Sequence, residues 1–502
     1  MKNTFLFLVL ISIITISLSC RKDFNTVANF GKLEFSSDTI FLDTIFSKIG
    51  SATYNLKVYN RSNKAITIPE IKLENGNTSK YRLNVDGESG KNFSNIDILA
   101  KDSLFIFVET TVDVSTVINP LYTDKILFDN GNQQQNVNLV TLIQDAHLLF
   151  PPKKNTAIIP ALRNITFDNE NIKIQARFLT DSELNFTAEK PYIIYGYMAV
   201  PAGKTLHIDA GSNIYFHKNS GLLIGDNASL KINGTLDKKV TFQGDRLAHM
   251  YNEIPGQWGC IWLGAGSLKN EIHHAIIKNG SIGLLVDAVA NENPALQLEN
   301  TEIYNHSNYG ILARNTHLKA ANLVIGNAGK SSLACIAGGN YSFTHSTFAN
   351  YWNNSLRQNP TVLISNYQEV IQENQQENQK KKTDLYNLYS ANFVNCIIEG
   401  NGSREFITDK KGDYIFKYAV ENSMLRFYNF DTSVNSSSNY KNIILNGTPD
   451  FKAMYSNNFS IGEYSDAIHK AKKTAISKDI LGVSRNTTPD IGAYQHIIFD
   501  EK

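Results

Sequence analysis

The chain has 502 residues, more than one ordinary domain needs, and 42% of them are hydrophobic. Its 48 basic and 47 acidic side chains leave a formal net charge of +1, so no overall field attracts it to DNA, RNA or anionic lipid. We therefore expect no nucleic-acid partner.

The first 19 residues have the pattern of a secretory signal peptide, with Lys2 ahead of an apolar run and small residues before Cys20. Small residues followed by Cys resemble a bacterial lipobox, although Ser17 stands where Leu is usual. The resemblance implies a lipidated Cys20, a tether over 20–29, and anchoring to the outer membrane of the cell envelope with the protein exposed at the cell surface. The alternative is an ordinary cleaved signal peptide followed by an incidental Cys.

Three further cysteines, Cys260, Cys335 and Cys396, are far apart in the sequence. An odd number without short spacing favours neither a disulfide framework nor a zinc site in an exported protein. Cys335 and Cys396 lie within apolar strands, so we predict buried thiols that act as small hydrophobic side chains. We expect no metal and no resident cofactor.

Residues 30–148 have the pattern of an all-β domain. Short alternating segments such as 54–59 and 104–108 are separated by turn-rich segments such as 60–63, which is typical of a β-sandwich. The turn Val-Tyr-Asn-Arg-Ser-Asn over 58–63, leading into Ile-Thr-Ile-Pro-Glu-Ile, resembles immunoglobulin-like domains of the abnormal-spindle and hydin type. The resemblance implies a module that binds a partner or acts as a spacer.

Residues 149–183 are predicted to be a linker with lead-in strands, because Pro151 and Pro152 interrupt strand pairing. From 184 to 496 the chain resembles right-handed parallel β-helix repeat proteins of the pectate-lyase-like fold, found as envelope lipoproteins. The motifs that carry this resemblance are Pro-Tyr-Ile-Ile-Tyr-Gly at 191–196, Val-Pro-Ala-Gly-Lys-Thr-Leu at 200–206 and Asp-Ile-Gly-Ala-Tyr-Gln at 490–495.

A repeated pattern between 271 and 350 supports the solenoid independently of the resemblance. The apolar positions Ile277, Ile303, Val324 and Phe348 follow one another at intervals of 26, 21 and 24 residues. One coil cannot bury its own apolar face, but stacked coils form a continuous core. Asn279, Asn305 and Asn350 are predicted to share one corner, with Gly326 in the same role, because both residue types adopt left-handed backbone angles.

Two excursions interrupt the predicted coils. The first follows Phe242 and contains a Pro-Gly-Gln-Trp-Gly segment at 255–259. The second includes 368–382, a Gln, Asn, Glu and Lys tract with little to bury, which is interpreted as a mobile insertion. Asp479, Arg485 and Asp490 are predicted to tie a C-terminal cap together, followed by a tail at 497–502.

Asp287 and Arg314 each follow the equivalent strand on successive predicted coils, so they are expected to be neighbours. They are interpreted either as a carboxylate and base that hold a uronate or as a structural ion pair. Asp245, Arg246 and Trp258 lie in the first excursion, where an aromatic face beside charges suits a sugar-binding rim. The alternative there is a loop held on the solenoid by Trp258.

Together, Asp245, Arg246, Trp258, Asp287 and Arg314 are the predicted ligand-binding surface. The favoured function is a non-catalytic lipoprotein that binds a polysaccharide or a surface partner, with the membrane contacted through the lipid anchor. The alternative is a polysaccharide lyase or glycoside hydrolase of the pectate-lyase-like fold. Ca²⁺ is expected only if the lyase alternative holds, and then its ligands are short in number, because no acidic residue repeats beyond Asp287.

Overall fold

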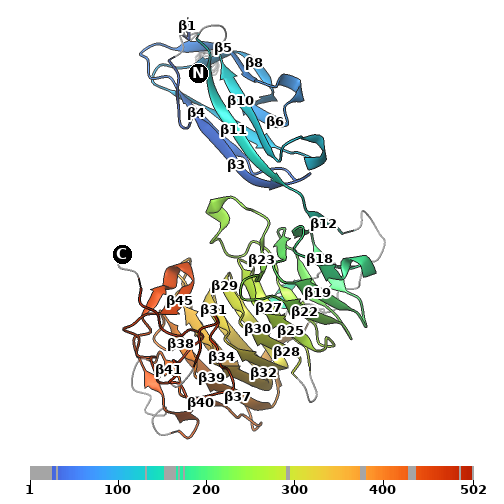
Figure 1. Ribbon diagram of the computed structural model, residues 1–502, viewed down its shortest axis with the longest axis vertical. Coiled ribbons are helices and arrows are strands. Elements are labelled where there is room, and N and C mark those ends of the chain that lie inside the picture. The colour runs from blue at the N-terminus through green and yellow to red at the C-terminus, as the bar shows by residue number, and fades with distance from the viewer. Residues whose placement is uncertain are drawn as a thin grey trace, which may run out of the picture. The chain divides into compact units, whose positions relative to one another are not determined.

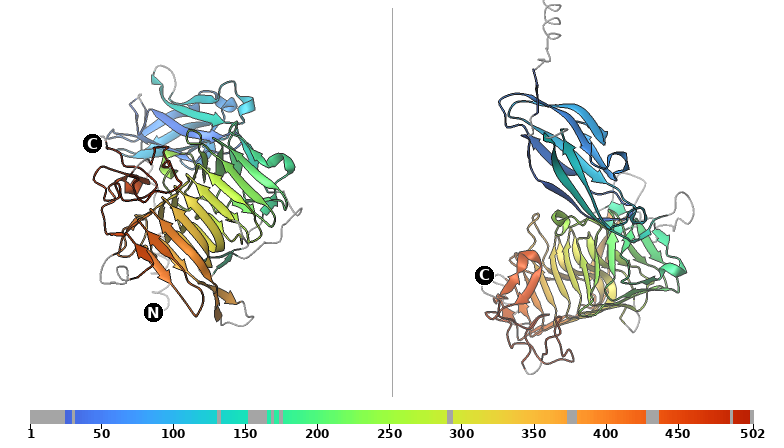
Figure 2. Two further views of the ribbon diagram at one scale, coloured as in Figure 1. Left: turned by 60° about the horizontal axis from the view of Figure 1, so that its bottom comes forward. Right: turned by 45° about the horizontal axis from the view of Figure 1, so that its top comes forward.

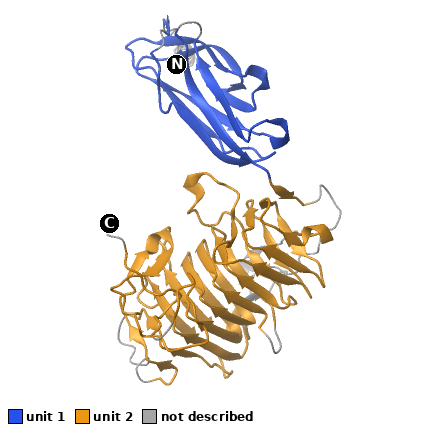
Figure 3. Ribbon diagram, viewed as in Figure 1, with its two compact units in different colours: residues 1–145 blue, residues 146–502 orange. Residues whose placement is uncertain are grey.

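The computed structural model describes residues 25–29, 32–129, 133–151, 165–167, 170–172, 176–289, 294–372, 380–427, 437–485 and 488–499 (Figure 1). The chain is all-β and divides into two compact units, residues 1–145 and 146–502 (Figure 3). The predicted signal peptide and Cys20 lie outside the described residues. The fold class predicted from sequence, a β-sandwich followed by a β-helix-like solenoid, is confirmed.

The first unit is a sandwich of two sheets. One sheet pairs in the order β1 (Val27–Ala28), β5 (Ile66–Leu73), β10 (Leu121–Phe128), β11 (Gln135–Gln144), β3 (Thr39–Phe46), with β8 (Asn92–Ile98) also on β5. The other pairs in the order β2 (Glu34–Phe35), β4 (Tyr54–Tyr59), β9 (Ser103–Thr110), β6 (Tyr81–Val85), β7 (Glu88–Gly90). Short 3₁₀ turns η1 (Gly76–Thr78) and η2 (Val114–Thr116) join strands.

Strict alternation in the strands builds the sandwich core. In β4, Leu56 and Val58 are fully buried while their neighbours are not, and β9 alternates in the same way. The turn at 60–63 depends on Asn60, which is buried and whose amide donates to the carbonyls of Lys64, Ile98 and Leu99. This side chain therefore satisfies backbone groups that the turn leaves unpaired.

The second unit is a solenoid whose strands pair in parallel from coil to coil, forming three faces (Figure 2). Face A consists of β12 (His147–Leu149), β17 (Tyr192–Ile194), β20 (Asn213–Phe216), β23 (Val240–Gly244), β26 (Ala275–Lys278), β29 (Glu302–His306), β31 (Val324–Ala328), β33 (Thr347–Asn350), β38 (Ile397–Gly400), β41 (Met424–Leu425) and β43 (Ile444–Leu445).

The long strands β30 (Tyr309–Ala321) and β32 (Ser331–Thr344) bend from face B into face C. The remaining strands of face B are β15 (Ala176–Phe178), β18 (Tyr197–Val200), β21 (Gly221–Ile224), β24 (Ile261–Leu263), β27 (Ile282–Val286), β34 (Val362–Ser365) and β39 (Phe406–Asp409). Those of face C are β16 (Asn185–Phe186), β19 (Thr205–Asp209), β22 (Ser229–Asn233), β25 (Asn270–His273), β28 (Leu296–Glu299), β37 (Leu388–Val394), β40 (Ala419–Glu421) and β42 (Tyr440–Lys441).

Three antiparallel hairpins lie outside these faces: β13 (Ile165–Phe167) with β14 (Glu170–Ile172), β35 (Tyr367–Gln372) with β36 (Lys380–Leu385), and β44 (Phe451–Ala453) with β45 (Asn458–Ile461). The second hairpin includes the two ends of the predicted insertion at 368–382, whose middle, 373–379, lies outside the described residues. Its two arms pair residue by residue, from Tyr367 with Leu385 to Gln372 with Lys380. Backbone pairing, which needs no apolar side chains, therefore holds the two described ends of the tract together.

The solenoid also begins earlier than predicted. β12 pairs in parallel with β17, and β15 pairs with β18, so strands within the predicted linker at 149–183 and just before it already belong to the first coil. Accordingly, the division between the units falls after Asp145 rather than after residue 148.

The coil register differs by one residue from the predicted repeat. Ile303 pairs with Ile325, which in turn pairs with Phe348, so the intervals are 22 and 23 residues rather than 21 and 24. The corner residue of that coil is consequently Asn327, with φ of 41°, and not Gly326. Asn279 and Asn305 occupy the same corner with φ of 66° and 57°, and the Asn305 amide donates to Asn279 Oδ1 at 2.9 Å.

A second corner, between faces C and A, carries a longer column of residues with left-handed angles. Its members are His274, Asn300, Asn322, His345, Asn395, Asn422 and Asn442. Their side chains bond to one another and to the C-terminal segment; for example, Asn395 Nδ2 donates to the Lys472 carbonyl at 2.8 Å. This column fixes where the C-terminal segment lies.

That segment, residues 447–499, is termed the strap. It is the segment predicted as a C-terminal cap, and it lies along the outer side of face A. Outward residues of face A become apolar beneath it: Tyr304, Val324, Ala349, Ile397 and Met424 are buried against Phe459, Ile461, Ile480, Ile491 and Ala493 of the strap. Asp479 and Arg485 hold the strap itself, since Asp479 accepts from three backbone amides and Arg485 Nη1 donates to Gln495 Oε1 at 2.8 Å.

Candidate functional site

Asp287 and Arg314 are neighbours, as their positions in the repeat predict. Arg314 Nε donates to Asp287 Oδ1 at 2.6 Å, and Trp262 Nε1 donates to Asp287 Oδ2 at 2.9 Å. Burial by itself favours a lower pKa for Arg314, but the hydrogen bonds and charge of Asp287 raise it overall. Asp287 is 5% exposed, and both of its oxygens are used within the protein. Both carboxylate oxygens are bonded to neighbouring side chains and shielded from solvent, so we assign the pair a structural role.

Asp245 and Arg246 begin the excursion after β23, which contains the 3₁₀ turn η5 (His249–Tyr251). Asp245 Oδ2 lies 2.7 Å from His217 Nδ1, and the His217 ring stacks on Tyr195 with 4.5 Å between centroids. Burial, together with the charge of Asp245, raises the pKa of Tyr195 to about 12. Arg246 is exposed and places its guanidinium 4.9 Å from the centroid of the Tyr251 ring. Asp245 therefore orders a column of rings at the edge of face A.

Trp258 is buried, and this corrects its predicted role as a stacking face for a ligand. Only 1% of its surface is exposed, its ring stacks on Phe216 at 4.4 Å, and its Nε1 donates to the Lys278 carbonyl at 2.9 Å. Burying the large apolar surface of a Trp side chain stabilises the folded protein more than leaving that surface in water. Trp258 thus anchors the excursion to the core.

The five predicted residues consequently do not form one surface. Asp245 follows a strand of face A, whereas Asp287 follows β27 at the far edge of face B. Five strand residues at about 3.3 Å each separate those edges by roughly 16 Å. The sequence located the strand ends correctly but did not show that they lie at different edges.

A groove of about 590 Å³ lies on the outer side of face A, along the edge of the part that the strap covers. Its floor is made of outward side chains from β20, β23, β26 and β29, which are polar at most positions: Asn213, Thr241, Gln243, Ile276, Lys278, Glu302 and Tyr304. The strap supplies one wall, with Ser456, Asn457, Asn458, Ser460, Leu481 and Tyr494. The floor thus presents hydrogen-bonding groups from four successive coils.

Charges in the groove are partly paired. Lys239 forms an ion pair with Glu302, and the Tyr304 hydroxyl donates to the same carboxylate. Burial raises the pKa of Tyr304 well above its ordinary value, so its hydroxyl remains a donor at neutral pH. Lys278 also lines the floor. The groove therefore offers amide, hydroxyl, ammonium and carboxylate groups together, a mixture suited to a polyhydroxylated ligand.

The first excursion contacts the strap through residues that line the groove. Asn457 Nδ2 donates to Glu253 Oε2 at 3.0 Å, and Asn305 Nδ2 donates to the Glu253 carbonyl at 2.7 Å. Glu253 is exposed and lines the groove. The first excursion, which sequence reasoning selected through Trp258, thus contributes to the groove through Glu253 instead.

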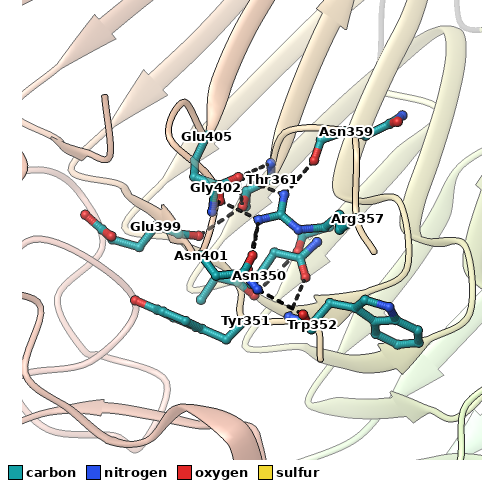
Figure 4. Close-up of polar contacts among 12 residues, drawn as sticks. Asn350, Tyr351, Trp352, Arg357, Asn359, Thr361, Glu399, Asn401, Gly402 and Glu405 are labelled. Carbon is teal, nitrogen blue, oxygen red and sulfur yellow. Dashed lines mark hydrogen bonds and ion pairs between the residues drawn. The ribbon is translucent and has the colours of Figure 1, made fainter. Parts of the chain in front are cut away.

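Two buried carboxylates, Glu399 and Glu405, lie near the start and end of a turn between faces A and B (Figure 4). Glu405 is fully buried and accepts from both Arg357 Nη atoms, from the Gly402 amide, and from the Thr361 amide at 2.7 Å. Burial opposes ionisation, but these hydrogen bonds and the Arg357 charge lower the pKa of Glu405 overall.

Glu399 behaves in the opposite way. It faces the outer side of face A beneath the strap, is 1% exposed, and points away from the Arg357–Glu405 pair (Figure 4). Burial raises its pKa to about 8. Two carboxyl groups with pKa values pushed apart are typical of an acid and base pair, but a substrate cannot reach side chains that are this deeply buried. We therefore assign this cluster a structural role.

The described residues include no group of three or more His, Cys, Asp or Glu side chains arranged to hold a metal ion. Cys260, Cys335 and Cys396 are free and buried. Within the described part of the chain, no helix has both the length and the apolar character needed to cross a membrane.

Comparisons with known proteins add little. No protein-family profile matches the chain, and no curated protein matches it. One similar solved structure is a family 123 glycoside hydrolase from Clostridium perfringens, described in terms of glycolipid glycan hydrolysis. The match has 7% identity and a TM-score of 0.17, and it covers 22% of this chain and 27% of that chain. A score this low carries no argument about fold or function.

Proposed function

We propose that this protein is a cell-envelope lipoprotein of the right-handed parallel β-helix repeat class, which binds a saccharide in the groove on face A without cleaving it. The observation that carries the binding role is the polar floor. Face A is apolar where the strap covers it and polar where the strap ends, at Asn213, Thr241, Gln243 and Lys278. The part of face A that the strap leaves uncovered is polar, and such a surface is suited to contact with a hydrated ligand.

The test is a glycan array followed by two matched double variants. Gln243→Ala with Lys278→Ala removes two side chains from the groove floor. Gln297→Ala with Lys319→Ala removes the same two residue types from paired positions on the outer side of face C. Binding of an array hit should fall at least about tenfold in the first variant, since each lost hydrogen bond is worth about 1 kcal/mol. It should be unchanged in the second. If the two double variants bind the array hit equally well, the groove is not the binding site.

The alternative is a glycoside hydrolase or polysaccharide lyase, and one observation favours it: two carboxylates, Glu253 and Glu302, line the same groove. Glu302 is engaged by Lys239 and Tyr304, which is why we favour binding without cleavage. Incubating an array hit with the wild-type chain and with Glu302→Gln distinguishes the two. Product formed by the wild type and not by the variant establishes the enzyme.

Lipid attachment rests on the N-terminal sequence: the basic residue, the apolar run and the small residues before Cys20. In a bacterial host, the wild-type chain should sediment with the membrane fraction, and Cys20→Ala should appear in the soluble fraction. If Cys20→Ala stays with the membrane, the anchor is not a lipid on this residue.

A further inference from the structure

The outer face of the sandwich sheet containing β4, β9 and β6 carries exposed aromatic side chains on its central strand, β9. Inward residues of β9, such as Ile106 and Val108, are fully buried, as expected. The outward positions that alternate with them are aromatic, with Phe105 44% exposed and Phe107 42% exposed. Their rings lie 6.4 Å apart and are nearly parallel, with 14° between planes. Two adjacent phenyl groups in water on a central strand contribute little to the core.

Polar side chains flank these rings in register. Phe107 lies opposite Asn55 on β4 and opposite Asn84 on β6, so a carboxamide stands on each side of the exposed ring. Phe105 lies opposite Lys57, whose ammonium is 5.0 Å from the Phe105 centroid and 5.4 Å from the Tyr59 centroid. We term the set Asn55, Lys57, Tyr59, Asn84, Phe105 and Phe107 the aromatic platform.

Charge on this face is unbalanced at Lys57. Arg61 pairs with Glu34 at 2.9 Å, and Arg82 lies 3.7 Å from Glu109, so both guanidinium groups have carboxylate partners. No carboxylate among the described residues lies within ion-pair distance of the Lys57 ammonium, which rests on the rings instead. The platform therefore complements a ligand that carries a negative charge.

From these observations we propose that the aromatic platform is a second binding site, specific for an acidic polysaccharide with carboxylate groups on its sugar rings. The apolar faces of the sugar rings stack on Phe105 and Phe107, the carboxamides of Asn55 and Asn84 hydrogen-bond hydroxyl groups, and Lys57 pairs with a carboxylate. Two adjacent rings with hydrogen-bonding groups beside them suit an extended polymer. The site is separate from the groove on face A, and the proposal stands if the groove binds nothing.

The experiment uses the full chain carrying Gln243→Ala and Lys278→Ala, so that the groove does not contribute to the signal. Its binding to immobilised polygalacturonate is compared with that to fully methyl-esterified polygalacturonate. We expect the parent chain to bind the acidic polymer. The affinity should be at least about tenfold lower when Phe105→Thr and Phe107→Thr are both introduced. Threonine retains the strand preference while removing the rings. Lys57→Gln should weaken binding by about threefold or more and remove the preference for the acidic polymer.

Phe41→Thr is the matched control, because Phe41 is 66% exposed on β3 of the other sheet of the sandwich. It should bind as its parent does. The proposal is overturned by several results: no binding to polygalacturonate, unaltered binding by the Phe105 and Phe107 double variant, equal loss in Phe41→Thr, or equal binding of the esterified polymer. Binding to phosphatidylglycerol vesicles in place of either polymer would assign the face to a membrane and would also overturn it.

Discussion

Glu399→Gln should make the solenoid more stable at alkaline pH than the wild type. Glu399 is 1% exposed beneath the strap, and among the described residues its Oε1 atom has no hydrogen-bond partner. Burial raises its pKa to about 8, against partial compensation by the charge of Arg426 and the Gly400 amide. At neutral pH the folded protein therefore holds this carboxyl protonated, while the unfolded chain ionises it.

The sign and size of the effect follow from that difference. Between pH 4.5 and 8 the unfolded chain binds fewer protons at this position than the folded protein, so the free energy of unfolding falls as pH rises. Each pH unit between the two pKa values corresponds to about 1.4 kcal/mol, which amounts to roughly 5 kcal/mol lost by pH 8. Glutamine resembles the protonated acid and does not titrate. The variant should thus match the wild type near pH 4.5 and exceed it by several kcal/mol at pH 8.

Urea unfolding followed by tryptophan fluorescence measures this directly. The chain has three tryptophans, Trp258, Trp262 and Trp352, and all belong to the solenoid, so the signal reports that unit alone. His306 and His345, whose pKa values burial lowers to about 4 and about 3, impose a pH dependence of the opposite sign. That contribution is common to both proteins and cancels in the difference.

Glu405→Gln is the matched control, because Glu405 is equally buried but ionised and paired with Arg357. Its loss should destabilise the solenoid by about 3–5 kcal/mol at pH 7, since it leaves the Arg357 charge uncompensated. A stability difference between Glu399→Gln and wild type that stays constant from pH 5 to pH 8 would refute the reasoning, as would a variant less stable at pH 8.

Two further substitutions test the structural roles assigned here. Arg314→Ala leaves the buried Asp287 carboxylate without its partner and should lower the free energy of unfolding by about 3–5 kcal/mol, measured by urea titration; a change below about 1 kcal/mol would contradict the structural role. Gly326→Ala places a methyl group 2.2 Å from the Phe459 ring of the strap and should cost about 1–3 kcal/mol, with faster proteolysis of the strap as a second measurement; an unchanged cleavage rate would indicate that the strap is not held there.

The repeat in the solenoid was predictable because inward residues must match from coil to coil. Ile277 and Ile303 do pair, and the Asn279 and Asn305 corner is as predicted. The predicted register is wrong by one residue at Val324, because Ile325 is the residue that pairs with Ile303. The sequence there is Val324–Ile325, both apolar, because one faces the core and the other faces the strap. Alternation disappears when both sides of a strand are covered, so a local pattern cannot distinguish the two registers.

The predicted binding surface failed for a related reason. Trp258 stands in a Gly-rich and Pro-rich segment, a context that predicts an exposed loop, yet its ring fills space against Phe216. Burial of a single anchor side chain depends on what lies opposite it, which no local signal records. The polar outward positions at Thr241, Gln243 and Lys278 did carry a signal for the groove, but only in contrast with the apolar positions at Val324 and Ile397 farther along.

The amino-acid sequence by itself determined the elements of this protein: alternating strands for a sandwich, stacked coils for a solenoid, and left-handed corners at Asn. These depend on side-chain period and on backbone angle, which are local properties. Tertiary structure alone decided where the strap lies, which part of face A stays open, and which carboxyl group is protonated. The position of the strap depends on contacts between residues more than 100 positions apart, such as Asn327 with Asn457 and Thr347 with Ala493. Such contacts form, and stabilise the protein, only after the coils have stacked.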